Sequence, residues 1–186
     1  DLTHDGTTTI TTDTAGGNVT FGGAIETDAD DDDLLVITSG TGAVTFTGAI
    51  GVTEELGGLS VNASSGNGTI TFTSTIGDTS NGAGVIGTTA VGNSTTTGLT
   101  FSSTDYSFDG ATTFTAVITG DIDMASAVEF TTVADNISFA SGDIELANGA
   151  NLSIDTGAAG GNITIGGSVG GHSVETVTID AGTGTA

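Results

Sequence analysis

The sequence has no lysine, arginine, proline, cysteine or tryptophan, and several of these absences exclude a class of protein. Without lysine or arginine the chain cannot neutralise phosphates, so we expect no nucleic-acid partner. The net charge of −23 argues against an anionic membrane surface, and no run is long and apolar enough for membrane insertion. Without cysteine there is no disulfide framework. Without lysine or arginine, trypsin-like proteases have no cleavage site in the chain.

The residues that are present favour β-strands. Valine, isoleucine, phenylalanine and threonine alternate with small polar residues through most of the chain, and these side chains suit a pleated, half-buried surface. The alternation outweighs the high charge and glycine content, which by themselves would favour disorder. No stretch has a helical period with capping residues. We therefore predict an all-β protein.

The chain repeats itself at long range. The segment "AGGNVTFGGAI" at Ala15–Ile25 returns as "AGGNITIGGSV" at Ala159–Val169, an offset of 144 residues from residue 15 to residue 159. Residues 1–44 and 145–186 are therefore interpreted as copies of one repeat of about 144 residues.

A shorter repeat of about 25 residues lies inside the long one. Phe21, Phe46 and Phe72 are separated by 25 and 26 residues, as are Phe114, Phe139 and Ile165. Units of this length with matching positions are typical of stacked coils. We predict that one core ladder contains Phe21, Phe46, Phe72, Phe114, Phe139 and Ile165.

The predicted fold is a right-handed parallel β-helix (β-solenoid) with about 25 residues per coil and 7–8 coils, spanning 1–186 as a single segment. Glycine and asparagine are expected at its bends. Residues 82–109 depart from the repeat and are interpreted as an irregular insertion. A β-sandwich is the alternative, since it also has short strands with turn residues between them.

The units "GGNVTFGGAI", "GTGAVTFTGAIG", "LGGLSVNAS" and "GGNITIGGSV" resemble giant bacterial β-strand-repeat surface proteins. They are also similar to the β-helical shafts of filamentous-haemagglutinin-like adhesins. This resemblance implies secretion, a right-handed β-helix and a structural or adhesive role at the cell surface. It implies no catalytic site, and we expect the chain not to be an enzyme.

Six carboxylates crowd into the segment "ETDADDDD". Calcium takes six to eight oxygen ligands, so a Ca²⁺ site is one interpretation and a solvated acidic loop is the other. The second copy of the repeat lacks the acidic run, and the segment has no EF-hand pattern. The predicted metal ligands are Glu26, Asp28, Asp30, Asp31, Asp32 and Asp33.

Seven of the nine asparagines stand in Asn-X-Ser/Thr form, the acceptor pattern for N-glycosylation. Serine and threonine are abundant, so chance matches are expected, and stacked asparagines could instead hydrogen-bond from coil to coil. The predicted glycosylation sites are Asn18, Asn62, Asn67, Asn93, Asn136, Asn151 and Asn162.

Other candidates for chemistry are weaker. Asp121 and Asp123 would share one face of a strand, as a hydrolase acting on polysaccharide would need, but solvated residues are favoured. His4 and His172 have no triad partners and are expected at the surface. The Thr-x-Thr pattern in Thr69–Thr73 resembles ice-binding β-solenoids and is also ordinary strand surface.

The favoured function is a structural section of an extracellular fibre or adhesin shaft. An open solenoid end is an unpaired strand edge and a template for association. We expect the end near Ala186 to stack on something resembling Asp1–Ile25, either the next repeat or the next subunit. The expected partners are thus copies of the chain itself and divalent cations. The alternative is a surface binding module that contacts a glycan or another cell through 82–109 or the acidic loop.

Overall fold

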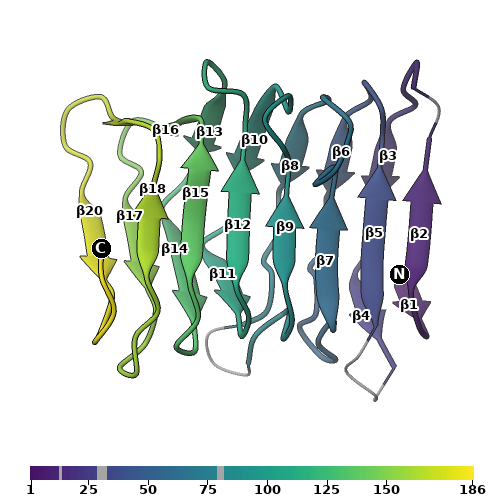
Figure 1. Ribbon diagram of the computed structural model, residues 1–186, viewed down its shortest axis with the longest axis horizontal. Helices are drawn as coiled ribbons and strands as arrows, with labels where there is room; N and C mark the ends of the chain where they lie inside the picture. The colour runs from purple at the N-terminus through teal and green to yellow at the C-terminus, as the bar shows by residue number, and fades with distance from the viewer. Residues whose placement is uncertain (13, 29–32, 79–81) are drawn as a thin grey trace.

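The chain folds into a right-handed parallel β-solenoid without a helix in the part that the computed structural model describes, residues 1–12, 14–28, 33–78 and 82–186 (Figure 1). The chain passes through three faces in turn and completes seven coils before β20 begins an eighth. All pairings between named strands are parallel. The solenoid prediction is confirmed, and the β-sandwich alternative is wrong.

Each face stacks one strand per coil. Face A contains β1 (Leu2–His4), β4 (Ile25–Thr27), β11 (Asp105–Phe108), β14 (Val128–Thr132), β17 (Leu152–Asp155) and β20 (Val177–Asp180), with single bridges at Ile50 and Ile76 between β4 and β11. Face B contains β2 (Thr8–Thr11), β5 (Leu34–Thr38), β7 (Gly58–Val61), β9 (Thr89–Val91), β12 (Thr112–Thr115), β15 (Ile137–Ser141) and β18 (Ile163–Ile165). Face C contains β3 (Val19–Phe21), β6 (Val44–Phe46), β8 (Ile70–Phe72), β10 (Gly98–Phe101), β13 (Asp121–Met124), β16 (Asp143–Leu146) and β19 (Val169–Gly170).

The core is a set of apolar ladders, because residues at the same position of successive coils lie directly above one another. On face C, Phe21, Phe46, Phe72 and Phe101 are in register, and their neighbouring rings stack at 4.8–5.4 Å between centroids. Phe46, Phe72 and Phe101 are fully buried.

The prediction that six residues form one ladder is wrong, because they lie on two different faces. Phe114, Phe139 and Ile165 belong to face B, where Phe114 lies above Val91. A spacing of 25 or 26 residues recurs on every face, so it does not say which face a residue occupies. The single sequence ladder therefore divides into two, one on face C and one on face B.

The two copies of the long repeat also occupy different faces. Phe21 lies in β3 of face C in the first coil, whereas its counterpart Ile165 lies in β18 of face B in the seventh. Leu2 of face A likewise corresponds to Leu146 of face C in the sixth coil. The offset between the two copies is therefore five full turns plus two of the three faces, which is one face short of six turns. Each copy is thus rotated by one face relative to the other.

Residues 82–109 are not an irregular insertion. β9, β10 and β11 continue the three faces in register with the coils on both sides. The extra length comes earlier, where an antiparallel bridge joins Asp78 to Gly82. This explains why Phe101 lies 29 residues after Phe72 although the two pair directly.

Tyr106, the single tyrosine of the chain, is a buried member of the face A ladder, and its ring meets Phe101 of face C edge-on. Its hydroxyl donates to the Phe72 carbonyl at 3.2 Å and accepts from the amides of Ser102 at 3.2 Å and Ser103 at 3.0 Å. Burial raises the pKa of Tyr106 to about 12, although the two amide hydrogen bonds act in the opposite direction.

We therefore expect the tyrosinate absorbance at 295 nm to appear near pH 12 in the folded protein. The pKa is raised above its ordinary value of 10.0, so burial of the neutral phenol stabilises the fold fully below pH 10 and this contribution is lost as the pH rises through 12. A spectrophotometric titration of this one tyrosine measures it directly. A folded chain that titrates near pH 10 would contradict the buried placement.

Candidate functional site

The described acidic residues of this segment, Glu26, Asp28 and Asp33, lie at the corner between faces A and B in the second coil. Glu26 belongs to β4, and its Oε2 accepts the amides of Thr53 at 3.2 Å and Glu54 at 3.1 Å in the coil above. Asp28 is half-buried and its amide donates to the His4 carbonyl at 3.2 Å. Asp30, Asp31 and Asp32 lie outside the described residues. The Ca²⁺ site stays a prediction, and the described residues contain no group of three metal-ligating side chains.

Asp33 and His4 are unexpected members of this corner because both are buried. Asp33 exposes 1% of its surface and His4 exposes 6%. The expectation that His4 is a surface residue is therefore wrong, whereas His172 is exposed. Asp33 Oδ2 and His4 Nε2 have no hydrogen-bond partner among the described residues.

The predicted glycosylation sites fall into two groups. Asn62 is fully buried in a left-handed conformation with φ of 51°, and its side chain bonds Ser39 through the backbone amide at 2.8 Å and the hydroxyl at 3.0 Å. A glycan on Nδ2 would break this contact, so the folded coil argues against Asn62 as an acceptor. Asn93 Nδ2 donates to the carbonyls of Asn62 and Gly66, so its amide hydrogens are also engaged.

Four of the remaining asparagines connect successive coils. Asn136 Oδ1 accepts the amide of Asn162 at 2.7 Å, and Asn162 Oδ1 accepts the amide of Thr185 at 3.1 Å. Asn18 and Asn151 do the same for Ala43 and Thr176, at 3.0 and 2.9 Å. These four asparagines thus hydrogen-bond from coil to coil, and their glycosylation stays a prediction. Asn67 is exposed.

Asp121 and Asp123 do share the outer surface of β13, as predicted. In the coil above, Asp143 and Glu145 lie in register with them, which makes a grid of four carboxylates on face C. Burial, followed by the charges of Asp121 and Glu145, raises the pKa of Asp123. The grid repeats a strand pattern, and no other group converges on it to mark a reaction centre.

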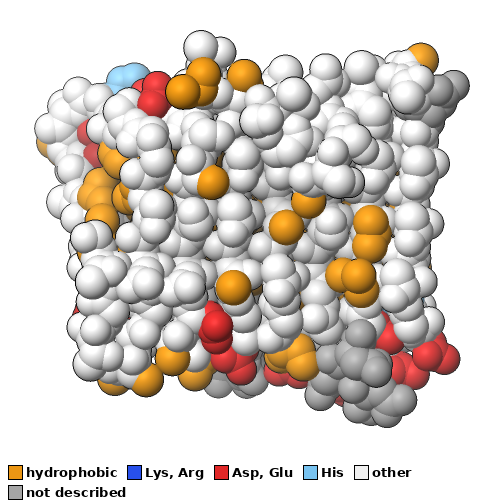
Figure 2. Space-filling model, in the orientation of Figure 1, with side chains coloured by type: hydrophobic (Ala, Val, Ile, Leu, Met, Phe, Trp, Pro, Cys, Tyr) orange, Lys and Arg blue, Asp and Glu red, His pale blue; other side chains and the backbone are white. Residues whose placement is uncertain are grey.

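Faces B and C also have rows of uncharged side chains. Thr20, Thr45, Thr71 and Thr100 stack in register on face C, and Thr47 and Thr73 follow two of them by two residues. No aspartate or glutamate occurs in the strands of face B, the face toward the viewer in Figure 2, where the acidic side chains gather toward the edges. Thr69–Thr73 thus lies at a regular strand surface, and ice binding stays untested.

Both ends of the described coil have open strand edges. β1, β2 and β3 form one edge, and β18, β19 and β20 form the other. On β20, Val177 and Ile179 expose 42% and 41% of their surfaces, whereas the residues directly below them, Leu152 and Ile154, expose 1% and 0%. Sequence reasoning identified the open ends but missed these inward-facing residues of the last coil.

Comparison of the chain with protein-family models, curated proteins and solved structures finds no match. The described residues include no helix long and apolar enough to cross a membrane.

Proposed function

We propose that this chain is a structural section of an extracellular fibre or adhesin shaft, extended head-to-tail through its open coil edges. One observation carries the proposal: Val177 and Ile179 are two-fifths exposed, although they continue a ladder that is buried one coil below. One further coil would bury them in the same way. The partner that matches the shape and the unpaired backbone groups of this open edge is therefore another coil of the same kind.

The backbone supports a specific register for this contact. Ile163 donates its amide to the Thr185 carbonyl at 2.8 Å, just as Val19 donates to the Ala43 carbonyl at 2.9 Å. By this correspondence Ala186 takes the position of Val44. Leu2 of a following copy, two residues after Ala186, would then take the position of Phe46. It would face inward above Ile165, as Phe46 lies above Phe21.

This contact is heterologous, because the two surfaces that meet are different ends of the chain. It does not close into a ring, so it generates a filament. The net charge of −23 opposes the approach of two copies, and we therefore expect assembly to increase with ionic strength.

The absence of lysine and arginine supports an exposed, extracellular location, since trypsin-like proteases would find no site in the shaft. The alternative of a binding loop at 82–109 has less support, because β9, β10 and β11 are regular coil strands.

Introducing a charge at the open edge tests the proposal. We expect the unmodified chain to form fibres at raised salt and Ile179→Lys to remain monomeric, because the lysine would be buried at the junction between copies. Ile118→Lys is the matched control, since Ile118 is 78% exposed in a turn on the side of the coil. Light scattering and negative-stain microscopy measure the outcome.

Two results would contradict head-to-tail assembly. One is an unmodified chain that stays monomeric at every concentration and salt. The other is fibre formation that Ile179→Lys and Ile118→Lys reduce equally, since the contact would then not involve the open edge.

A further inference from the structure

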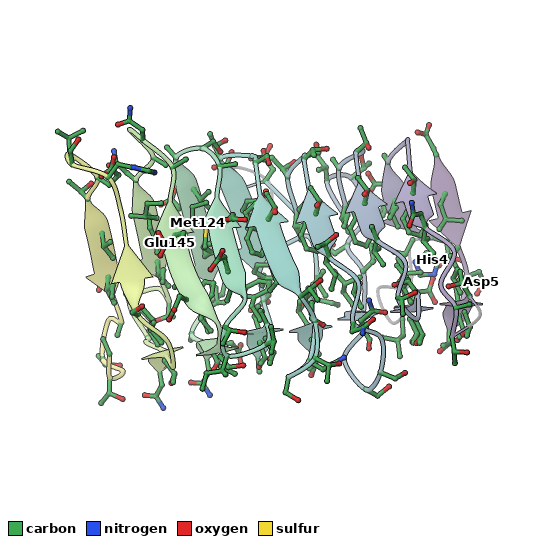
Figure 3. All side chains as sticks on the ribbon, turned by 90° about the horizontal axis from the view of Figure 1, so that it is seen from above. His4, Asp5, Met124 and Glu145 are labelled. Carbon is green, nitrogen blue, oxygen red and sulfur yellow. The ribbon has the colours of Figure 1, made fainter. Side chains whose placement is uncertain are left out.

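Two buried polar side chains meet the same glycine near the beginning of the coil. Gly6 donates its amide to Asp33 Oδ1, and the carbonyl of Gly6 lies 3.2 Å from His4 Nδ1. His4 and Asp33 are 6% and 1% exposed, and Figure 3 places His4 inside the coil and Asp5 at the outer end of the molecule. Gly6 therefore ties the imidazole to the carboxylate across two coils.

The hydrogen bond at Gly6 determines the chemistry of the imidazole. A carbonyl oxygen only accepts, so Nδ1 must be the protonated nitrogen. In the neutral ring Nε2 then has a free lone pair, and this atom is buried without a partner in the described part of the chain. A histidine fixed in this way by a backbone carbonyl has the arrangement of a metal ligand.

Asp33 supplies a second unsatisfied acceptor. Its Oδ2 is buried without a hydrogen-bond partner among the described residues. An ionised carboxylate in such a place requires a compensating charge, because an unpaired ion loses its hydration on burial with nothing to replace it. The chain contains no lysine or arginine, so the charge comes either from a protonated His4 or from a bound cation.

The surrounding column shows that this corner is otherwise apolar or internally satisfied. His4 is in register with Thr27, whose hydroxyl donates to the Glu55 carbonyl at 2.7 Å. Further along the corner, Leu56, Val85 and Phe108 form a fully buried apolar ladder. Only in the first two coils does the corner hold a histidine and a carboxylate with atoms left unsatisfied, among the residues described.

We propose that His4 Nε2 and Asp33 Oδ2 bind one divalent transition-metal ion, of which Zn²⁺ is the type, and that the ion joins the first two coils. An imidazole nitrogen with a carboxylate oxygen suits Zn²⁺, whereas Ca²⁺ takes oxygen ligands alone. Two protein side chains leave the remaining positions to backbone carbonyls or water. A buried water could donate to both atoms but would not neutralise Asp33. This site is independent of fibre assembly.

The test is a calorimetric titration of the chelator-treated chain with ZnCl₂ and, separately, with CaCl₂. We expect one saturable Zn²⁺ site per chain, weakened at least tenfold in Asp33→Asn and in His4→Gln. Asp5→Asn, which removes an exposed carboxylate beside the site, should bind as the unmodified chain does. Circular dichroism confirms that each variant keeps its strand content.

Nitrogen-detected NMR of the unmodified chain gives a second readout that does not depend on the variants. The chain has two histidines, and Zn²⁺ should shift Nε2 of His4 while leaving His172 unchanged. The proposal is overturned by an absence of saturable Zn²⁺ binding, by binding that His4→Gln leaves intact, or by a site that prefers Ca²⁺. An unmoved His4 resonance on Zn²⁺ addition would overturn it as well.

Discussion

Replacing Phe101 with alanine should lower the free energy of unfolding by about 3–5 kcal/mol, the cost of deleting a fully buried phenylalanine ring. Phe101 is the centre of the aromatic core. Its ring stacks on Phe72 at 5.4 Å and meets Tyr106, Phe114 and Phe130 edge-on at 5.0 Å. The faces A, B and C all contribute to this cluster, so the cavity left by the substitution cannot collapse from one side. Urea unfolding followed by circular dichroism measures the change.

Phe21→Ala is the matched control for this prediction. Phe21 belongs to the same ladder but is half-buried in the first coil and contacts one aromatic ring, Phe46 at 5.2 Å. We expect it to cost clearly less than Phe101→Ala. Equal losses for the two variants would show that the faces do not converge at Phe101.

Gly48→Ala should also be strongly destabilising, by about 1–3 kcal/mol, because the coils approach too closely at this corner to admit a methyl group. A Cβ on Gly48 would lie 2.0 Å from the carbonyl oxygen of Gly23 in the coil below. The coils cannot separate there without stretching neighbouring bonds, such as the 2.8 Å contact from the Thr47 amide to the Phe21 carbonyl.

Gly22→Ala provides the comparison, since a Cβ at Gly22 would meet nothing within 4 Å. Its free energy of unfolding, measured with urea, should change by no more than an ordinary surface substitution does, about 0.5 kcal/mol. If Gly48→Ala proved as harmless as Gly22→Ala, the close stacking of coils at the corner between faces C and A would be wrong.

The sequence was sufficient to predict the coil because parallel stacking places like residues above like residues. The spacing of Phe21, Phe46 and Phe72 records one turn of chain, and this spacing is readable without any structure. The assignment of faces was not readable. From Phe72 to Phe114 the chain completes one turn and two further faces, and a residue count does not separate this path from a whole number of turns with an insertion.

The candidate site was only partly predictable for a different reason. The acidic run pointed to Asp28 and Asp33, but composition does not reveal that the Asp33 side chain is buried. His4 had no sequence signal at all, because a single histidine beside polar residues is normally exposed. Asn62 misled in the opposite direction, since its Asn-X-Ser pattern indicated a surface site and the corner uses its amide internally.

The central claim is that the open edge of the last coil receives the first coil of another copy, turned by one face. Electron cryo-microscopy of fibres grown at raised salt tests this most directly. Seven turns and one face at the ordinary strand spacing predict a rise of ~35 Å per chain, with continuous density across the junction and Leu2 above Ile165. Discrete particles, or fibres in which the solenoids pack side by side with both edges in solvent, would contradict the account.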